Sequence, residues 1–120
     1  MIDITNSSLR PEEKTAVALG YFDGLHLGHV GVIRPALAQE GLKPAVFTFN
    51  CATTLPKFRG PEDIISFENK CELMQKIGVK YIYAPDFAEV CALSDEDFVK
   101  KILIDRLNAG FACCGSNFRF

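Results

Sequence analysis

Short apolar runs alternate with amphipathic stretches along the chain. The run at residues 15–22 (TAVALGYF) is compact and apolar and ends at a Gly/Asp turn, so it predicts a first β-strand. The run at residues 45–49 (AVFTF) predicts a second strand. Residues 81–84 and 111–114 predict two shorter strands, since each follows a glycine that can end a helix. An unbroken apolar strand such as AVFTF is typical of a parallel sheet that is covered on both faces.

Helical patterns fill the intervals between these strands. Ser66 can cap a helix that carries one apolar stripe at helical spacing. Ser94 and Asp97 resemble a capping box in front of a second apolar face, and a further helix is expected around His29. The two apolar faces consist of Phe67, Cys71, Met74 and Ile77, and of Phe98, Val99, Ile102, Leu103 and Leu107. The β-α-β-α-β-α-β order predicts a Rossmann-like three-layer α/β/α domain with a parallel sheet.

The predicted topology also indicates where a ligand would bind. In an open parallel sheet, ligands occupy the crevice beyond the carboxyl ends of the strands. The segments that leave these ends are residues 20–29, 50–54, 85–87 and 115–120. We therefore expect any chemistry to be found among these four segments.

The composition is that of one globular domain. Of the 120 residues, 48% are hydrophobic and 23% charged, which suffices for one core. The formal net charge of −2 gives no overall positive field, so neither nucleic acid nor a membrane surface is expected as a partner. Without a long apolar stretch or the pattern of a signal peptide, a cytoplasmic location is expected. The five cysteines are widely spread, and we expect reduced thiols that serve as small core residues.

The segment at residues 20–29 (GYFDGLHLGH) carries the strongest chemical signal. It places three glycines and two histidines where the first strand turns into a helix. A helix N-terminus offers free N–H groups and the positive end of the helix dipole, and glycines let the backbone approach a ligand closely. His26 and His29 can both donate hydrogen bonds to one anionic group above the first turn. This arrangement suits phosphoryl or nucleotidyl transfer without a covalent nucleophile.

Two other interpretations of the histidines remain open. The side chains can be solvated or structural, as is common for histidines near a turn. They can also ligate zinc, for which a third ligand would have to come from Asp23, Cys51 or Asp86. No recognised zinc spacing is present, so no metal ligand is assigned.

The same ten residues resemble the G-x-F-D-G-x-H-x-G-H signature of the FMN adenylyltransferase module of bacterial bifunctional riboflavin kinase/FAD synthetases, in the nucleotidyltransferase superfamily. The spacing of the two histidines alone would indicate only the superfamily, and the preceding Phe-Asp-Gly narrows it. Further segments resemble the family too, so the resemblance covers nearly the whole chain. They are residues 46–49 (VFTF), 66–70 (SFENK), 93–99 (LSDEDFV) and 115–120 (GSNFRF).

This resemblance implies an enzyme that transfers AMP from ATP to FMN, giving FAD and pyrophosphate. The FMN phosphate would be the nucleophile, and Mg²⁺ would neutralise charge between the phosphates. The two histidines would contact the ATP phosphates and stabilise the transition state. Carried over by position, the implied residues are His26 and His29 for catalysis and ATP binding, Gly20, Phe22, Asp23 and Gly24 for the ATP-binding loop, and Asn50 and Asn117 for the flavin.

The sequence departs from the family pattern in three places. Residues 48–53 (TFNCAT) lack the prolines and the histidine of the common T-F-x-P-H-P run. Pro35 falls within the predicted first helix, where its ring would clash with the carbonyl of Gly31, so we predict a kink or break between them. The chain also ends at Phe120, before the family's serine/threonine-rich segment with an arginine and its riboflavin kinase domain.

Residues 1–120 are therefore expected to be a partial FMN adenylyltransferase domain, with the riboflavin kinase domain absent and with little or no activity. Exposure of Phe118 and Phe120 predicts self-association at the truncated edge. Two alternatives stay open. One is a non-catalytic nucleotide-binding remnant, and the other is a related nucleotidyltransferase with another substrate, as in a cytidylyltransferase.

Overall fold

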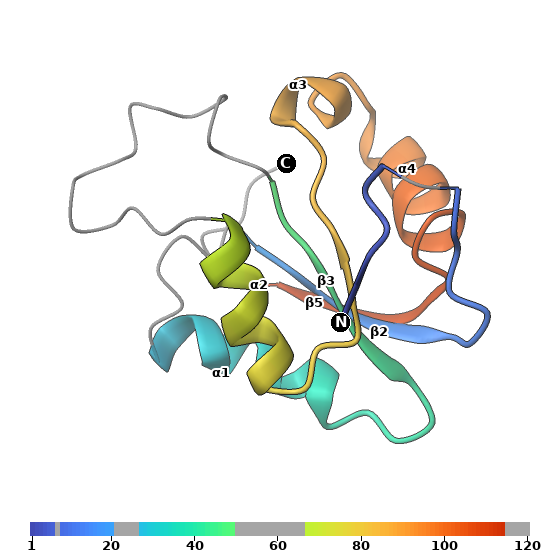
Figure 1. Ribbon diagram of the computed structural model, residues 1–120. Helices are drawn as coiled ribbons and strands as arrows, with labels where there is room; N and C mark the ends of the chain where they lie inside the picture. The colour runs from blue at the N-terminus through green and yellow to red at the C-terminus, as the bar shows by residue number, and fades with distance from the viewer. Residues whose placement is uncertain (7, 21–26, 50–66, 115–120) are drawn as a thin grey trace.

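The structure is a computed structural model that describes residues 1–6, 8–20, 27–49 and 67–114, and its centre is a parallel β-sheet (Figure 1). Within these residues five strands form the sheet, in the order β1-β4-β3-β2-β5. They are β1 (Ile2–Asp3), β2 (Thr15–Leu19), β3 (Lys43–Phe47), β4 (Tyr81–Tyr83) and β5 (Ala109–Cys114). The four predicted strands are confirmed, although their ends differ by one to three residues.

Strand β1 was missed by the sequence patterns. Its two residues, Ile2 and Asp3, are too few to show an alternation, and they become a strand by pairing with Tyr81 and Ile82 of β4. The Thr5 side chain continues this contact, since its hydroxyl oxygen accepts a hydrogen bond from the Ala84 backbone N–H at 2.9 Å. The strand therefore depends on a partner that lies far away in the sequence.

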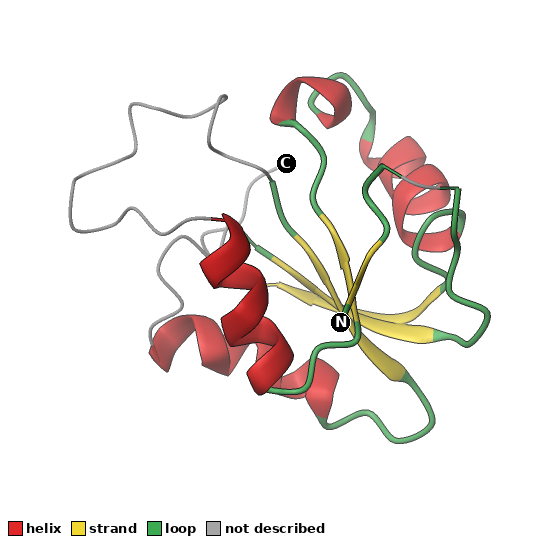
Figure 2. Ribbon diagram, viewed as in Figure 1, coloured by secondary structure: helices red, strands yellow, loops and turns green. Residues whose placement is uncertain are grey.

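Helices cover both faces of the sheet, as Figure 2 shows. Ile33, Ala36 and Met74 pack on one face against a cluster that includes Ala18 and Val46. They belong to α1 (Leu27–Leu37) and α2 (Phe67–Lys76), whereas α3 (Phe87–Val90), α4 (Asp95–Asp97) and the π-helix η3 (Phe98–Ile104) supply the opposite layer. The Rossmann-like three-layer α/β/α architecture is thus confirmed.

Burial along the strands follows their position in the sheet. Every residue of β2 is buried, because strands flank it on both sides and helices cover it on both faces, which explains its unbroken apolar sequence. In β5 half-buried and exposed residues alternate, and among the described strands β5 pairs with β2 alone. Strand β2 ends at Leu19 rather than at the predicted residue 22, and residues 21–22 lie outside the described part of the chain.

The structure describes one of the two predicted helix caps, that at Ser94. The Ser94 side chain accepts a hydrogen bond from the Asp97 backbone N–H at 3.1 Å, so the predicted cap is confirmed. Ser66 lies outside the described residues, and α2 begins directly after it at Phe67. The helix that follows Ser94 soon changes to π geometry, in which the Asp105 N–H bonds to the Lys100 carbonyl five residues back.

Helix α1 continues across Pro35. It is one helical element from Leu27 to Leu37, so of the predicted kink or break between Gly31 and Pro35 the break is wrong, whereas the kink stays a prediction. Pro35 is exposed, and its carbonyl accepts a hydrogen bond from the Gln39 side chain at 3.2 Å. Burial of Ile33 and Ala36 against the sheet holds the helix together where proline removes one backbone donor.

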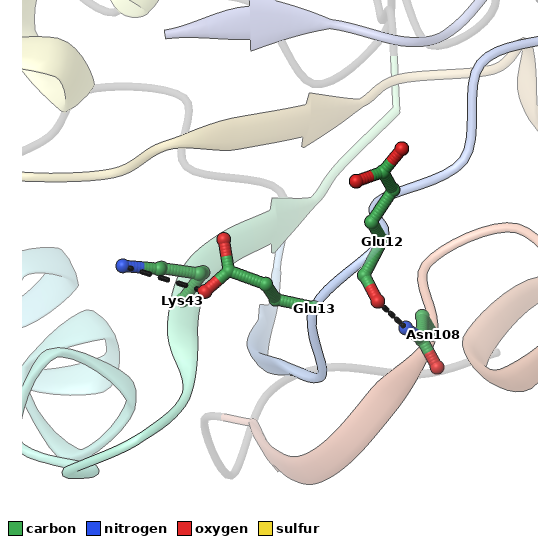
Figure 3. Close-up of polar contacts among 4 residues, drawn as sticks. All are labelled: Glu12, Glu13, Lys43 and Asn108. Atoms are coloured by element: carbon green, nitrogen blue, oxygen red, sulfur yellow. Dashed lines mark hydrogen bonds and ion pairs between the residues drawn. The ribbon is translucent and has the colours of Figure 1, made fainter.

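Asn108 closes the connection between η3 and β5. It is buried and has a φ of 53°, a left-handed conformation that favours asparagine or glycine. Its side-chain nitrogen donates to the carbonyls of Pro11 and Glu12 at 3.1 and 3.3 Å, as Figure 3 shows for Glu12. Its side-chain oxygen accepts a hydrogen bond from Arg10 at 3.2 Å. Asn108 therefore ties the segment before β2 to the start of β5.

We expect Asn108→Ala to lower the free energy of unfolding by about 2–3 kcal/mol, because it removes these hydrogen bonds and places a side chain with a Cβ in the left-handed region. Asn108→Gly relieves the backbone conformation and should cost about 1–2 kcal/mol. Urea unfolding of both variants measures the two contributions separately. Equal losses for alanine and glycine would show that the left-handed backbone contributes nothing.

Candidate functional site

The carboxyl ends of three neighbouring strands define the candidate site. Leu19, the last residue of β2, pairs with Phe47 of β3 on one side and with Cys114 of β5 on the other. The chain leaves β2 towards β3, whereas β5 arrives from β4 and lies on the other side of β2. The boundary between β2 and β5 is therefore the topological switch point, where open parallel sheets bind ligands.

The predicted motif begins at this switch point. Gly20 is buried, and its backbone N–H donates to the Phe47 carbonyl at 3.1 Å, which extends the pairing of β2 with β3 by one residue. Helix α1 then starts at Leu27, which places His29 in its first turn as predicted. The first turn of α1 contains no acidic residue, so no carboxylate of its own neutralises the positive end of the helix dipole.

The other predicted site residues lie outside the described part of the chain. They are Phe22, Asp23, Gly24, His26, Asn50 and Asn117. The structure does describe the strands that precede the segments in which these residues occur. Residues 20–29, 50–54 and 115–120 follow β2, β3 and β5 in the chain, and the last residue of β2 pairs with the last residues of both β3 and β5.

An aromatic cluster supports these strand ends, and the spacing of the sequence did not reveal it. The Phe47 ring lies edge-to-face with Phe49 and with Phe98, each at a centroid distance of 5.2 Å. Tyr83 packs at 6.0 Å from Phe47, and the Arg106 guanidinium lies 5.0 Å from the Tyr83 ring centroid. The members come from β3, β4, the π-helix and the loop after it, so only tertiary packing brings them together.

The thiol groups of the described cysteines differ in environment. Cys71 and Cys113 are partly buried, whereas Cys91 and Cys114 are exposed, so the expectation that all five serve as core residues is wrong for these two. Cys51 lies outside the described residues. Burial raises the pKa of the Cys113 thiol from its ordinary 9.0, while the Ala36 backbone N–H acts in the opposite direction and Cys114 adds to the rise.

Within the described ranges no three histidine, cysteine, aspartate or glutamate side chains come together in a way that could hold a metal ion. Of the three residues considered as a further zinc ligand, Asp86 is described and exposed after β4. Asp23 and Cys51 are outside the described residues. The helices that the structure describes include none that is long and apolar enough to cross a membrane.

Comparison with known proteins agrees with the family resemblance of the sequence. The sequence profile of a family described as FAD synthetase matches residues 9–120 of the chain. The chain belongs to the FAD synthetase family. A relative from Bacillus subtilis (strain 168), named Bifunctional riboflavin kinase/FMN adenylyltransferase, is 34% identical over 116 residues, which cover 91% of this chain and 36% of the relative.

Other relatives and a solved structure extend this result. A protein of the same name from Listeria monocytogenes is 37% identical over 106 residues, covering 79% of this chain and 34% of its own length. The chain thus spans about a third of the length of these two relatives. A structure titled Crystal Structure of Macrolide-efflux Protein from Streptococcus pneumoniae matches with a TM-score of 0.78 and 25% identity, covering 100% of this chain and 43% of that one.

Proposed function

We propose that this chain transfers AMP from ATP to FMN, giving FAD and pyrophosphate. The observation that carries the proposal is the switch point between β2 and β5, from which the segments at residues 20–29 and 115–120 both continue. Membership in the FAD synthetase family supports the choice of substrates. Residues 1–120 are assigned, as part of the same proposal, to the adenylyltransferase module alone.

The chemistry requires positioning and charge stabilisation. An oxygen of the FMN phosphate attacks the α-phosphorus of ATP, the bond from that phosphorus to the bridging oxygen breaks, and pyrophosphate leaves with the electron pair. The first turn of α1 would direct its N–H groups and the positive end of the helix dipole towards the leaving phosphates. His26 and His29 would donate hydrogen bonds to the same oxygens, so no protein nucleophile is needed.

The remaining residues of the proposed site have binding roles. Gly20 fixes where the chain leaves β2, through its bond to Phe47, and Phe22, Asp23 and Gly24 would shape the loop around ATP. Asn50 and Asn117 would hold the flavin from the ends of β3 and β5. Bound Mg²⁺ would supply positive charge between the phosphates.

Two further parts of the proposal concern the surroundings of the protein. Self-association at the truncated edge, predicted from exposure of Phe118 and Phe120, remains part of the proposal. Both residues lie outside the described part of the chain. Strand β5, which precedes them, pairs only with β2 among the described strands, and its six residues carry no charge that would oppose a second copy. A cytoplasmic location, where ATP and FMN are available, also remains part of it.

The proposal is tested by titrating the chain with nucleotides and with acceptors in the presence of Mg²⁺. We expect saturable binding of ATP and FMN by calorimetry, and weaker binding of CTP and phosphopantetheine. The formation of FAD in the same samples is followed by chromatography. A preference for CTP would favour a cytidylyltransferase, and saturable ATP binding without any binding of FMN would favour a nucleotide-binding remnant.

A further inference from the structure

The thiol of Cys113 contacts the backbone of α1. Its sulfur donates to the Val32 carbonyl at 3.4 Å, and the Ala36 backbone N–H faces the same sulfur. In a regular α-helix the Val32 carbonyl accepts from the N–H of Ala36, four residues further along. The Cys113 sulfur therefore faces both the acceptor and the donor of one backbone hydrogen bond of the helix, and the side chain also packs against neighbouring side chains.

The hydrogen bond between Val32 and Ala36 lies next to the position where α1 lacks a backbone hydrogen bond. Pro35 lies inside the helix and has no N–H, so the Gly31 carbonyl lacks the donor that a helix normally provides. The bond between Val32 and Ala36 follows immediately. The Cys113 thiol does not replace the bond lost at Gly31, but it adds a donor at the neighbouring Val32 carbonyl, and this donor comes from a strand instead of from the helix itself.

The contact joins two of the segments that meet at the proposed site. Val32 follows His29 by three residues, so the residue that Cys113 contacts lies about one helical turn beyond His29. Cys113 pairs with Ala18 of β2 and is the penultimate residue of β5, directly before the strand ends at Cys114. The thiol thus connects the helix that carries His29 to the strand from which residues 115–120 continue.

We infer that Cys113 is a positioning residue whose thiol holds the first half of α1, and with it His29, at a fixed place relative to the end of β5. Its effect on ATP binding rests on the proposed function. The thiol keeps its proton at neutral pH, available to the Val32 carbonyl, because its ordinary pKa of 9.0 already lies above neutral and burial raises this pKa further.

The test compares Cys113→Val with Cys113→Ser in the full chain. Valine fills the site and favours a strand but has no donor, so Tm should not fall, whereas serine keeps a hydroxyl donor. We expect amide hydrogen exchange at Ile33 and Ala36 to become roughly threefold to tenfold faster with valine, and the Kd for ATP to rise by a similar factor. Serine should return both to within about twofold of wild type, a rescue that packing alone would not produce.

Cys91→Val is the matched control. Cys91 also donates from sulfur to a backbone carbonyl, that of Ala88 at 3.8 Å, but it is exposed and far along the chain from α1. In the Cys91→Val variant, the amide exchange rates at Ile33 and Ala36 and the ATP affinity should equal those of wild type. Equal exchange rates in wild type and in Cys113→Val would overturn the inference. If wild type binds no ATP but Cys113→Val still exchanges faster, the proposed function is wrong and the contact between β5 and α1 stands.

Discussion

Replacing His26 and His29 together by alanine is expected to lower the rate of AMP transfer by about 10²–10³-fold or more. It should also weaken ATP binding by about tenfold or more, because each lost imidazole removes a hydrogen bond to a charged group. His29 lies in the first turn of α1, the helix that follows the carboxyl end of β2 in the chain. Calorimetry with ATP and Mg²⁺ measures the affinity, and FAD formation measures the rate.

Arg34→Ala is the control for this variant, since Arg34 is exposed in the last turn of the same helix, away from the strand ends. Its ATP affinity should stay within about twofold of wild type, because a charge beyond the first turn of a helix lies outside the region where the N-terminal dipole acts. Unchanged ATP binding by the double histidine variant would show that the ATP site lies elsewhere on the molecule.

Phe47→Ala is expected to lower the free energy of unfolding by about 3–5 kcal/mol, the usual range for removal of a fully buried phenylalanine. Phe47 has an exposed fraction of 0% and packs edge-to-face on Phe49 and Phe98. The substitution leaves a cavity between β3 and η3 and removes both ring contacts. Urea unfolding followed by circular dichroism measures the loss.

Phe47→Leu separates the contribution of the cavity from the contribution of the ring contacts. Leucine fills much of the cavity but makes no ring contacts, so the loss should be about 1–2 kcal/mol. A loss for Phe47→Ala below about 1 kcal/mol would mean that the aromatic cluster closes around the deleted ring. In that case the cluster would not provide rigid support for the strand ends.

The candidate site shows how far local patterns reach. The glycines and histidines of residues 20–29 pointed to an anion site where a strand turns into a helix, and the structure places Gly20 at the end of β2 and His29 in the first turn of α1. The contact of Cys113 with Val32 had no signal in the sequence, since the two residues are separated by 81 positions. Such a contact depends on which strand lies beside which helix.

The sequence by itself determined the elements whose cause is local. Apolar runs specified β2 and the buried end of β3, and Ser94 marked the start of a helix, because side-chain burial and capping act over a few residues. Contacts with distant parts of the chain determined the other elements. Strand β1 forms because it pairs with β4, and α1 continues across Pro35 because Ile33 and Ala36 are buried against the sheet. Backbone pairing and packing energies depend on partners distant in the chain, so only the tertiary structure placed β5 beside β2 and created the switch point.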